Sequence, residues 1–120
     1  MVAALIRSRL LLFTDGFYYP NICKRAIITL QPGTVIDRYG YVGGSYLSPI
    51  NTPYKARAVE PGTISKPYNV YVVKEPIRVY AGEVAPWFGM PGGGTQYYLG
   101  DGITVQLLLE GSNPKLEVLK

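Results

Sequence analysis

The stretch RAIITLQPGTVIDRY, residues 25–39, contains two strand patterns on either side of a turn signal. Its first part, Arg25–Leu30, is rich in β-branched residues, and its second part, Thr34–Tyr39, has the alternating character of a strand. Between them lies Gln31-Pro32-Gly33, a turn signal that contains glycine. Two strand patterns joined by so short a turn predict an antiparallel hairpin.

The rest of the chain predicts further short strands, separated by Gly and Pro, over 68–73, 77–80, 82–85, 95–99 and 116–119, and a short helix over 103–109. Residues 1–13 form an apolar lead, either a helix or a strand. Residues 40–67 predict a long loop region, of the kind that carries function or stays disordered. The fold class is α+β: a small single domain, residues 1–120, mainly a twisted antiparallel β-sheet with long loops and one or two short helices.

The composition excludes several kinds of chemistry. The chain has no histidine, so neither Ser-His-Asp machinery nor a His-bound zinc can exist. Its single cysteine, Cys23, cannot form an internal disulfide and is expected to be a small buried hydrophobe. The net charge of +4 suits an anionic ligand but is too small to predict nucleic-acid binding. Because Arg7 and Arg9 interrupt the apolar lead, we expect neither a signal peptide nor a membrane span.

Three segments combine charged or aromatic residues with glycines, which lets loops approach a bulky ligand closely. They are DRYGYVGGSYLSP (37–49), NTPYKARAVEPG (51–62) and APWFGMPGGGTQYYL (85–99). Each is a weak signal alone. The PGGGTQ run, for example, lacks the Lys-Ser or Lys-Thr of a phosphate-binding P-loop.

In this order and spacing, the segments resemble the tuberculosis necrotizing toxin type of NAD glycohydrolase. The resemblance begins near Tyr18 and runs to the end of the chain, leaving residues 1–17 uncovered. Its most specific part is APWFGMPGGGTQY (85–97), and the shared APWFG stretch makes the fungal members more similar than the bacterial ones. Met90 departs from the pattern, since the family often has glutamine there.

The resemblance implies a set of site residues. The essential glutamine of the family falls on Gln96, the predicted catalytic residue. The motif arginines fall on Arg38 and Arg57, and the motif aromatics fall on Tyr39 and Tyr46. The predicted substrate-binding set is completed by Gly93, Gly94 and Thr95.

The chemistry agrees with these residue types. Nicotinamide leaves NAD as a neutral molecule, so the acid that ordinary glycosidases need is unnecessary. The amide of Gln96 is expected to hold a ribose hydroxyl or the incoming water. Arg38 and Arg57 offer forked donors to the diphosphate, and Tyr39 and Tyr46 offer flat faces to nicotinamide.

Two further expectations concern the glycine-rich segment and its surroundings. The backbone N–H groups of Gly93 and Gly94 are expected to form a small anion nest. Trp87 and Phe88 are expected to be core residues beneath the loops rather than ligand contacts. Without the resemblance, we would interpret Arg38 as one partner of a surface ion pair, with Asp37 as the other.

The sequence therefore predicts an NAD⁺ glycohydrolase that cleaves the nicotinamide–ribose bond of NAD, with NADP left open. Two alternatives remain: a mono-ADP-ribosyltransferase, although no E-x-E segment is present, and an NAD-binding module without turnover. No cofactor or metal is expected, since NAD is the substrate and the calcium site of fungal members lies in a C-terminal extension. The resemblance suggests a secreted or cell-surface protein and leaves open a proteinaceous inhibitor (immunity factor) and a homo-oligomer.

Overall fold

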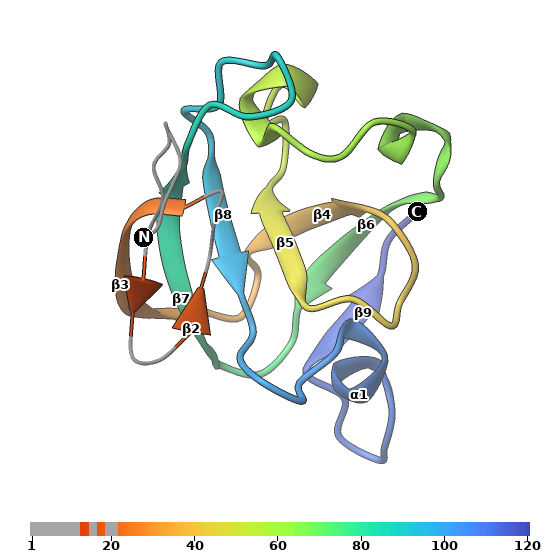
Figure 1. Ribbon diagram of the computed structural model, residues 1–120. Helices are drawn as coiled ribbons and strands as arrows, with labels where there is room; N and C mark the ends of the chain where they lie inside the picture. Colours follow the sequence, from red (N-terminus) through yellow and green to blue (C-terminus); the bar gives the residue numbers. More distant parts are fainter. Residues whose placement is uncertain (1–12, 15–16, 19–21) are drawn as a thin grey trace.

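The computed structural model describes residues 13–14, 17–18 and 22–120 (Figure 1). Its strands and helices, in chain order, are β1 (Phe13–Thr14), β2 (Phe17–Tyr18), β3 (Ile22–Leu30), β4 (Val35–Tyr39), β5 (Tyr46–Pro49), the 3₁₀ helices η1 (Tyr54–Arg57) and η2 (Thr63–Ser65), β6 (Tyr68–Val73), β7 (Ile77–Val84), β8 (Thr95–Tyr98), α1 (Val105–Leu109) and β9 (Leu116–Val118). The predicted lead, residues 1–13, lies outside the described residues apart from Phe13, and so does the side chain of Cys23.

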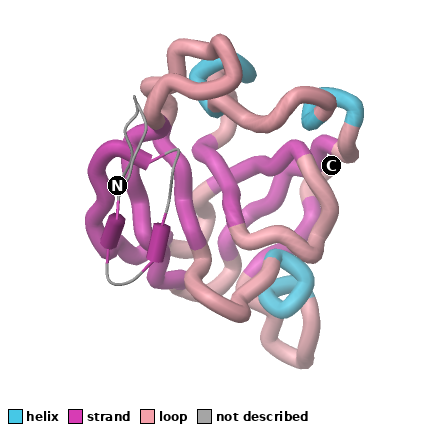
Figure 2. The backbone as a smooth tube through the Cα atoms, viewed as in Figure 1, coloured by secondary structure: helices cyan, strands magenta, loops and turns pink. Residues whose placement is uncertain are grey.

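One seven-stranded sheet organises the domain, in the order β3-β7-β8-β5-β4-β6-β9. Every neighbouring pair in it is antiparallel. Figure 2 shows how little of the chain is helical and how the loops between β5 and β6 and between β7 and β8 gather at the same end of the sheet. The predicted fold class, a small α+β domain built mainly on an antiparallel sheet, is confirmed.

The predicted hairpin between β3 and β4 is wrong. The turn itself is present, because the Thr34 N–H donates to the Gln31 carbonyl over 3.1 Å and Gly33 has a φ of +95°. However, β3 pairs with β7, while β4 pairs with β5 on one side and with β6 on the other. Both edges of β4 are therefore occupied, and none is left for β3. The Gly33 N–H also bonds the Val73 carbonyl at 2.8 Å, which fixes the turn to the end of β6.

The other differences concern continuity and length. The segment predicted as one long loop, 40–67, contains β5, η1 and η2. The two strands predicted over 77–80 and 82–85 form the single strand β7, because Gly82 stays in register with Gln96 of β8. The predicted helix starts later, at Val105, where the side chain of Thr104 accepts a bond from the Leu107 N–H at 3.2 Å. Among the described residues, no helix is long and apolar enough to cross a membrane.

The hydrophobic core lies on one face of the sheet. In the ladder, Ile36 is opposite Tyr71, so these two side chains share that face. Helix α1 covers this side, with Val105 fully buried. The buried cluster comprises Leu30, Ile36, Leu47, Tyr71, Val73, Ile77, Val79, Leu99, Val105 and Leu116.

Candidate active site

The opposite face of the sheet carries several polar side chains beside a smaller hydrophobic cluster around Tyr98. Asp37 of β4 lies opposite Ser48 of β5, and Tyr46, two residues before Ser48, lies opposite Tyr98 of β8. Gln96 precedes Tyr98 by two residues. Because facing residues and alternate residues of a strand share one face, all five side chains lie on the face opposite the cluster that contains Ile36 and Tyr71. The antiparallel register thus gathers residues from three strands, β4, β5 and β8, at one place.

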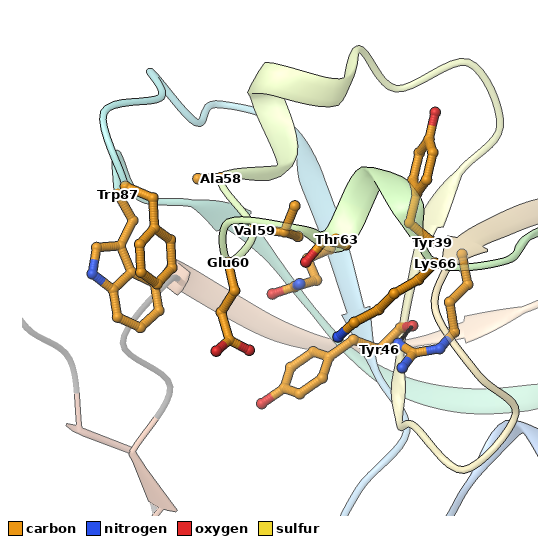
Figure 3. A pocket seen from close by; sticks show the side chains of 11 residues that line it. Tyr39, Tyr46, Ala58, Val59, Glu60, Thr63, Lys66 and Trp87 are labelled. Atoms are coloured by element: carbon orange, nitrogen blue, oxygen red, sulfur yellow. Dashed lines mark hydrogen bonds between the residues drawn. The ribbon is translucent and has the colours of Figure 1, made fainter.

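A cavity of about 290 Å³ opens over this face (Figure 3). Its lining includes four of the predicted site residues, Arg38, Tyr39, Tyr46 and Gln96. The loop that carries η1 and η2 and the loop between β7 and β8 provide the rest of the wall. Gln96 is buried, with 6% of its surface exposed. The size of the cavity is at the lower end of the range typical of small-molecule sites.

Arg38 is held by the loop that joins β4 to β5. Its Nε donates to the Tyr41 carbonyl at 2.9 Å and its Nη1 donates to the Tyr46 carbonyl at 2.8 Å. A Cβ atom at Gly44 would overlap the guanidinium, so this glycine makes room for it. Burial lowers the pKa of Arg38, but an arginine remains charged at neutral pH. Nη2 makes no hydrogen bond to the described part of the chain and can donate to a ligand.

Arg57 occupies a different environment from the one predicted. It is 5% exposed, and its Nη1 and Nη2 donate to the two carboxylate oxygens of Asp37 at 2.6 and 2.9 Å. Its Nε and Nη2 also donate to the Thr52 carbonyl at 3.0 and 2.8 Å. Four of its five N–H groups are therefore used inside the protein. Arg57 does not present a fork to the cavity, and Asp37 is paired with Arg57 rather than with Arg38.

Tyr39 lies in the cavity wall above this ion pair. The Arg57 Cζ atom is 4.9 Å from the centroid of its ring. Tyr54 meets the ring edge-on with a centroid separation of 5.1 Å, and Tyr68 meets it at a tilt with a separation of 4.6 Å. These distances suit aromatic and cation–π contacts. Three neighbours thus restrict the orientation of the Tyr39 ring.

The prediction that Trp87 and Phe88 are core residues is wrong. They are 37% and 38% exposed, and both line the cavity. Their rings stack on each other with centroids 4.3 Å apart and an interplanar angle of 22°. Trp87 and Met90 exchange backbone hydrogen bonds of 3.1 and 2.8 Å, and this turn places Phe88 at a φ of +52°. The exposure of these rings could have been predicted from the sequence. Both rings lie in a short turn flanked by Pro and Gly, and no strand passes there that could bury them.

The expected anion nest at the glycine run is also absent. The Gly93 N–H donates to the Val84 carbonyl at 2.7 Å, and the Gly94 N–H donates to the Ala56 carbonyl at 3.0 Å. Gly94 instead permits close packing, since a Cβ atom there would lie 2.9 Å from the Ala56 oxygen. Thr95 is exposed and adjoins Gln96 along β8, so its side chain is on the other face of the strand.

Two charged residues of the cavity were missed by the sequence analysis. Glu60 and Lys66 are exposed, and Figure 3 shows both side chains reaching toward the cavity from the loop around η2. Within the described part of the chain, neither forms a salt bridge. No motif marks them, because their position depends on how the loop folds over the sheet. Among the same described residues, no three or more Cys, Asp or Glu side chains are grouped so that they could hold a metal ion.

The structure is a small α+β domain with a cavity lined by charged residues, aromatic rings and the buried amide of Gln96. The sequence profile of the tuberculosis necrotizing toxin family matches residues 29–113, and the chain belongs to this family.

Individual relatives agree with this assignment. The conidial surface nicotinamide adenine dinucleotide glycohydrolase nadA of Aspergillus fumigatus is 40% identical over 76 residues. The aligned part covers 58% of this chain and 32% of the relative, so the chain spans about a third of that protein's length.

Two solved structures share the fold. Tuberculosis necrotizing toxin, solved in complex with its immunity factor, has a TM-score of 0.66 and 23% identity, over 85% of this chain and 63% of that chain. Rhs1-CT, solved with its cognate immunity protein RhsI1, has a TM-score of 0.60 and 18% identity, over 85% of this chain and 82% of that chain.

Proposed function

We propose that the chain is an NAD⁺ glycohydrolase that hydrolyses NAD to nicotinamide and ADP-ribose. The observation that carries the proposal is the placement of Gln96, buried at the floor of a cavity that Arg38 and Tyr46 also line, in a chain of the necrotizing toxin family. The activity named for the fungal relative supports the same reaction.

The proposed reaction needs little proton transfer from the protein. The bond between the nicotinamide nitrogen and the ribose C1′ breaks, and its electron pair stays on the nitrogen, which neutralises the cationic ring. A water oxygen forms the new bond to C1′, and its proton passes to solvent. Gln96 positions this water or a ribose hydroxyl, so it contributes orientation rather than acid–base catalysis.

The remaining residues of the cavity bind the dinucleotide. Arg38 meets the diphosphate through Nη2, and Lys66 supplies the second positive charge that Arg57 does not present. The stacked rings of Trp87 and Phe88, together with Tyr46, offer flat surfaces to the two bases of NAD.

The comparisons also bear on the partners and the setting of the protein. Both structural relatives were solved with immunity proteins, which supports a protein inhibitor for this chain as well. The fungal relative is named as a conidial surface protein, which supports a site of action outside the producing cell. We assign the NAD glycohydrolase domain to the whole chain, residues 1–120.

Incubation of the purified chain with NAD, followed by chromatography of nicotinamide and ADP-ribose, tests the proposal. We expect equal amounts of both products, at a rate that chelator does not change. If nicotinamide is released without free ADP-ribose, and the ADP-ribosyl group of labelled NAD is found on protein, the chain is an ADP-ribosyltransferase instead. Tight binding of NAD with no nicotinamide release would indicate a binding module, and activity that requires calcium would show that a metal takes part.

A further inference from the structure

A polar network centred on a buried carboxylate lies next to the cavity. Its Asp37 and Arg57 do not line the 290 Å³ cavity but a small adjoining one of about 40 Å³, which Gln96 also lines. The centre of the network is Asp37, which is 0% exposed and accepts hydrogen bonds from Arg57 on both carboxylate oxygens. Tyr68 donates a third bond from its hydroxyl to Asp37 Oδ2 at 2.7 Å. Arg57 is bound in turn to the Thr52 carbonyl. The network therefore joins strand β4, helix η1 and the start of β6.

The same network reaches the cavity through Tyr39. Two of the three groups that touch the Tyr39 ring are Arg57 and Tyr68, and both are held by Asp37. Tyr39 itself lines the cavity. Its orientation thus depends on a carboxylate that is not among the residues lining the 290 Å³ cavity.

A buried ion pair by itself contributes little to the stability of a protein. Removing both charges from water costs free energy that their attraction only partly returns, and apolar residues of similar volume often do as well. The apolar core of this domain lies on the opposite face of the sheet. What the pair provides is fixed geometry, since a bidentate Arg–carboxylate contact has one preferred arrangement.

We infer that Asp37 is a positioning residue of the NAD site, which acts through Arg57 and Tyr68 to hold the ring of Tyr39 in the cavity wall. The inference rests on the proposed function, because it assigns the wall to NAD. It also changes the role of Arg57, from a ligand of the diphosphate to a support beneath an aromatic contact.

The role predicts a particular kinetic signature. In this role Tyr39 contacts a part of NAD away from C1′, and not nicotinamide as expected from the sequence, so a misplaced ring weakens the ground state and the transition state equally. Such a loss raises KM and leaves kcat nearly unchanged. A purely structural role would have the opposite effect, because partial unfolding reduces the amount of active protein, and hence the apparent kcat, without changing KM.

The experiment compares four variants of the full chain. Asp37→Asn removes the charge at the centre of the network, and Tyr68→Phe removes one hydroxyl while the Asp37–Arg57 pair stays intact. Glu117→Gln is the matched charge control, since it breaks only an exposed pair with Lys74 (3.7 Å). Tyr97→Phe is the matched hydroxyl control on the core face.

Steady-state hydrolysis of NAD gives KM and kcat, and ADP-ribose binding is followed by the fluorescence of Trp87, the only tryptophan of the chain. We expect KM and the ADP-ribose Kd to rise about tenfold in Asp37→Asn and about threefold in Tyr68→Phe, with kcat within about twofold of wild type. Both controls should keep wild-type values.

Unchanged KM in a folded Asp37→Asn, or a loss confined to kcat, would overturn the inference. If Asp37→Asn does not fold, Tyr68→Phe decides the question by the same criterion. An inactive wild-type chain that gives no Trp87 response to NAD or ADP-ribose would reject the proposed function instead, so the two failures are distinguishable.

Discussion

In the proposed mechanism, Gln96 contributes to the turnover of NAD far more than to its binding. If it orients water or ribose only as the glycosidic bond breaks, its loss should slow the reaction far more than it weakens binding. Removing one preorganised contact of this kind typically lowers the rate by about 10²–10³. We expect Gln96→Ala to release nicotinamide about 100-fold more slowly and to bind NAD nearly as tightly as wild type, measured by single-turnover kinetics and Trp87 fluorescence.

The surface residue Gln106 provides the matched control for this change. It is exposed on α1, where its side chain contacts Glu110 at 3.0 Å, and Gln106→Ala should leave the reaction unaltered. A second variant, Gln96→Glu, places a carboxylate beside the forming oxocarbenium ion, so some turnover should survive and transfer or cyclisation should become detectable. Near wild-type turnover in Gln96→Ala would remove Gln96 from the mechanism.

Single residues show how far the sequence could predict the site. The motifs that contain Arg38, Tyr46 and Gln96 predicted one common site, and the structure brings the three side chains to one cavity, although their roles remain predictions. Arg57 could not be placed in this way, because a motif reports the residue type that is needed and not whether it faces ligand or protein. Its burial against Asp37 follows from the pairing of β4 with its neighbours and from the course of η1.

Among the secondary-structure elements, the connection between β4 and β5 has the sharpest mutational consequence. A Cβ atom at Gly44 would overlap the guanidinium of Arg38, whereas one at Gly43 has nothing within 4 Å. Gly44→Ala should therefore displace Arg38 from the cavity, weaken NAD binding and reduce the salt dependence of KM, because the charge no longer meets the diphosphate.

Gly43→Ala is the matched partner, since it adds the same methyl group one residue away and should behave like wild type. Titration of both variants with NAD at low and high salt, together with their thermal melts, checks this expectation. Equal NAD affinity in the two variants would show that the loop can move without disturbing Arg38.

The positions of the strands in the sequence were easier to predict than the pairing of one strand with another. The β-branched run in β3 and the alternation in β4 identified both strands, and the Pro32-Gly33 pair identified the turn between them. A hairpin was the local expectation, but β4 is a central strand whose two edges bind β5 and β6. Pairing across long sequence separations is decided by burial of the whole sheet, which a local pattern does not report.

At the scale of the whole molecule, three tyrosines make stability depend on alkaline pH. Burial, followed by the bond to Asp37, raises the pKa of Tyr68 to about 12, and burial also raises the pKa values of Tyr71 and Tyr97. An unfolded tyrosine titrates near 10, so between about pH 10 and 12 the unfolded chain loses protons that the folded chain keeps. This contribution to stability is complete below pH 10 and falls as the pH rises through this range.

Urea unfolding midpoints at several pH values between 9 and 12 would measure the effect. We expect the midpoint to fall steadily above pH 10, and to fall less steeply in Tyr68→Phe, which cannot titrate at that position. Tyr41→Phe, at a residue that is 64% exposed, should keep the wild-type slope. A slope that is the same in Tyr68→Phe and in wild type would contradict the prediction.

The strand order has a consequence for when the protein first becomes active. Strand β8, which carries Gln96, lies between β7 and β5, although β5 begins 49 residues earlier in the sequence, at Tyr46 against Thr95. A chain that has been synthesised only as far as β7 contains Arg38 and Tyr46, but it lacks the strand that joins their half of the sheet to β7. Contacts of such long sequence separation form late. Under the proposed function, chains that stop before β8 lack Gln96 and leave NAD intact, so an inhibitor needs to recognise only chains that contain β8.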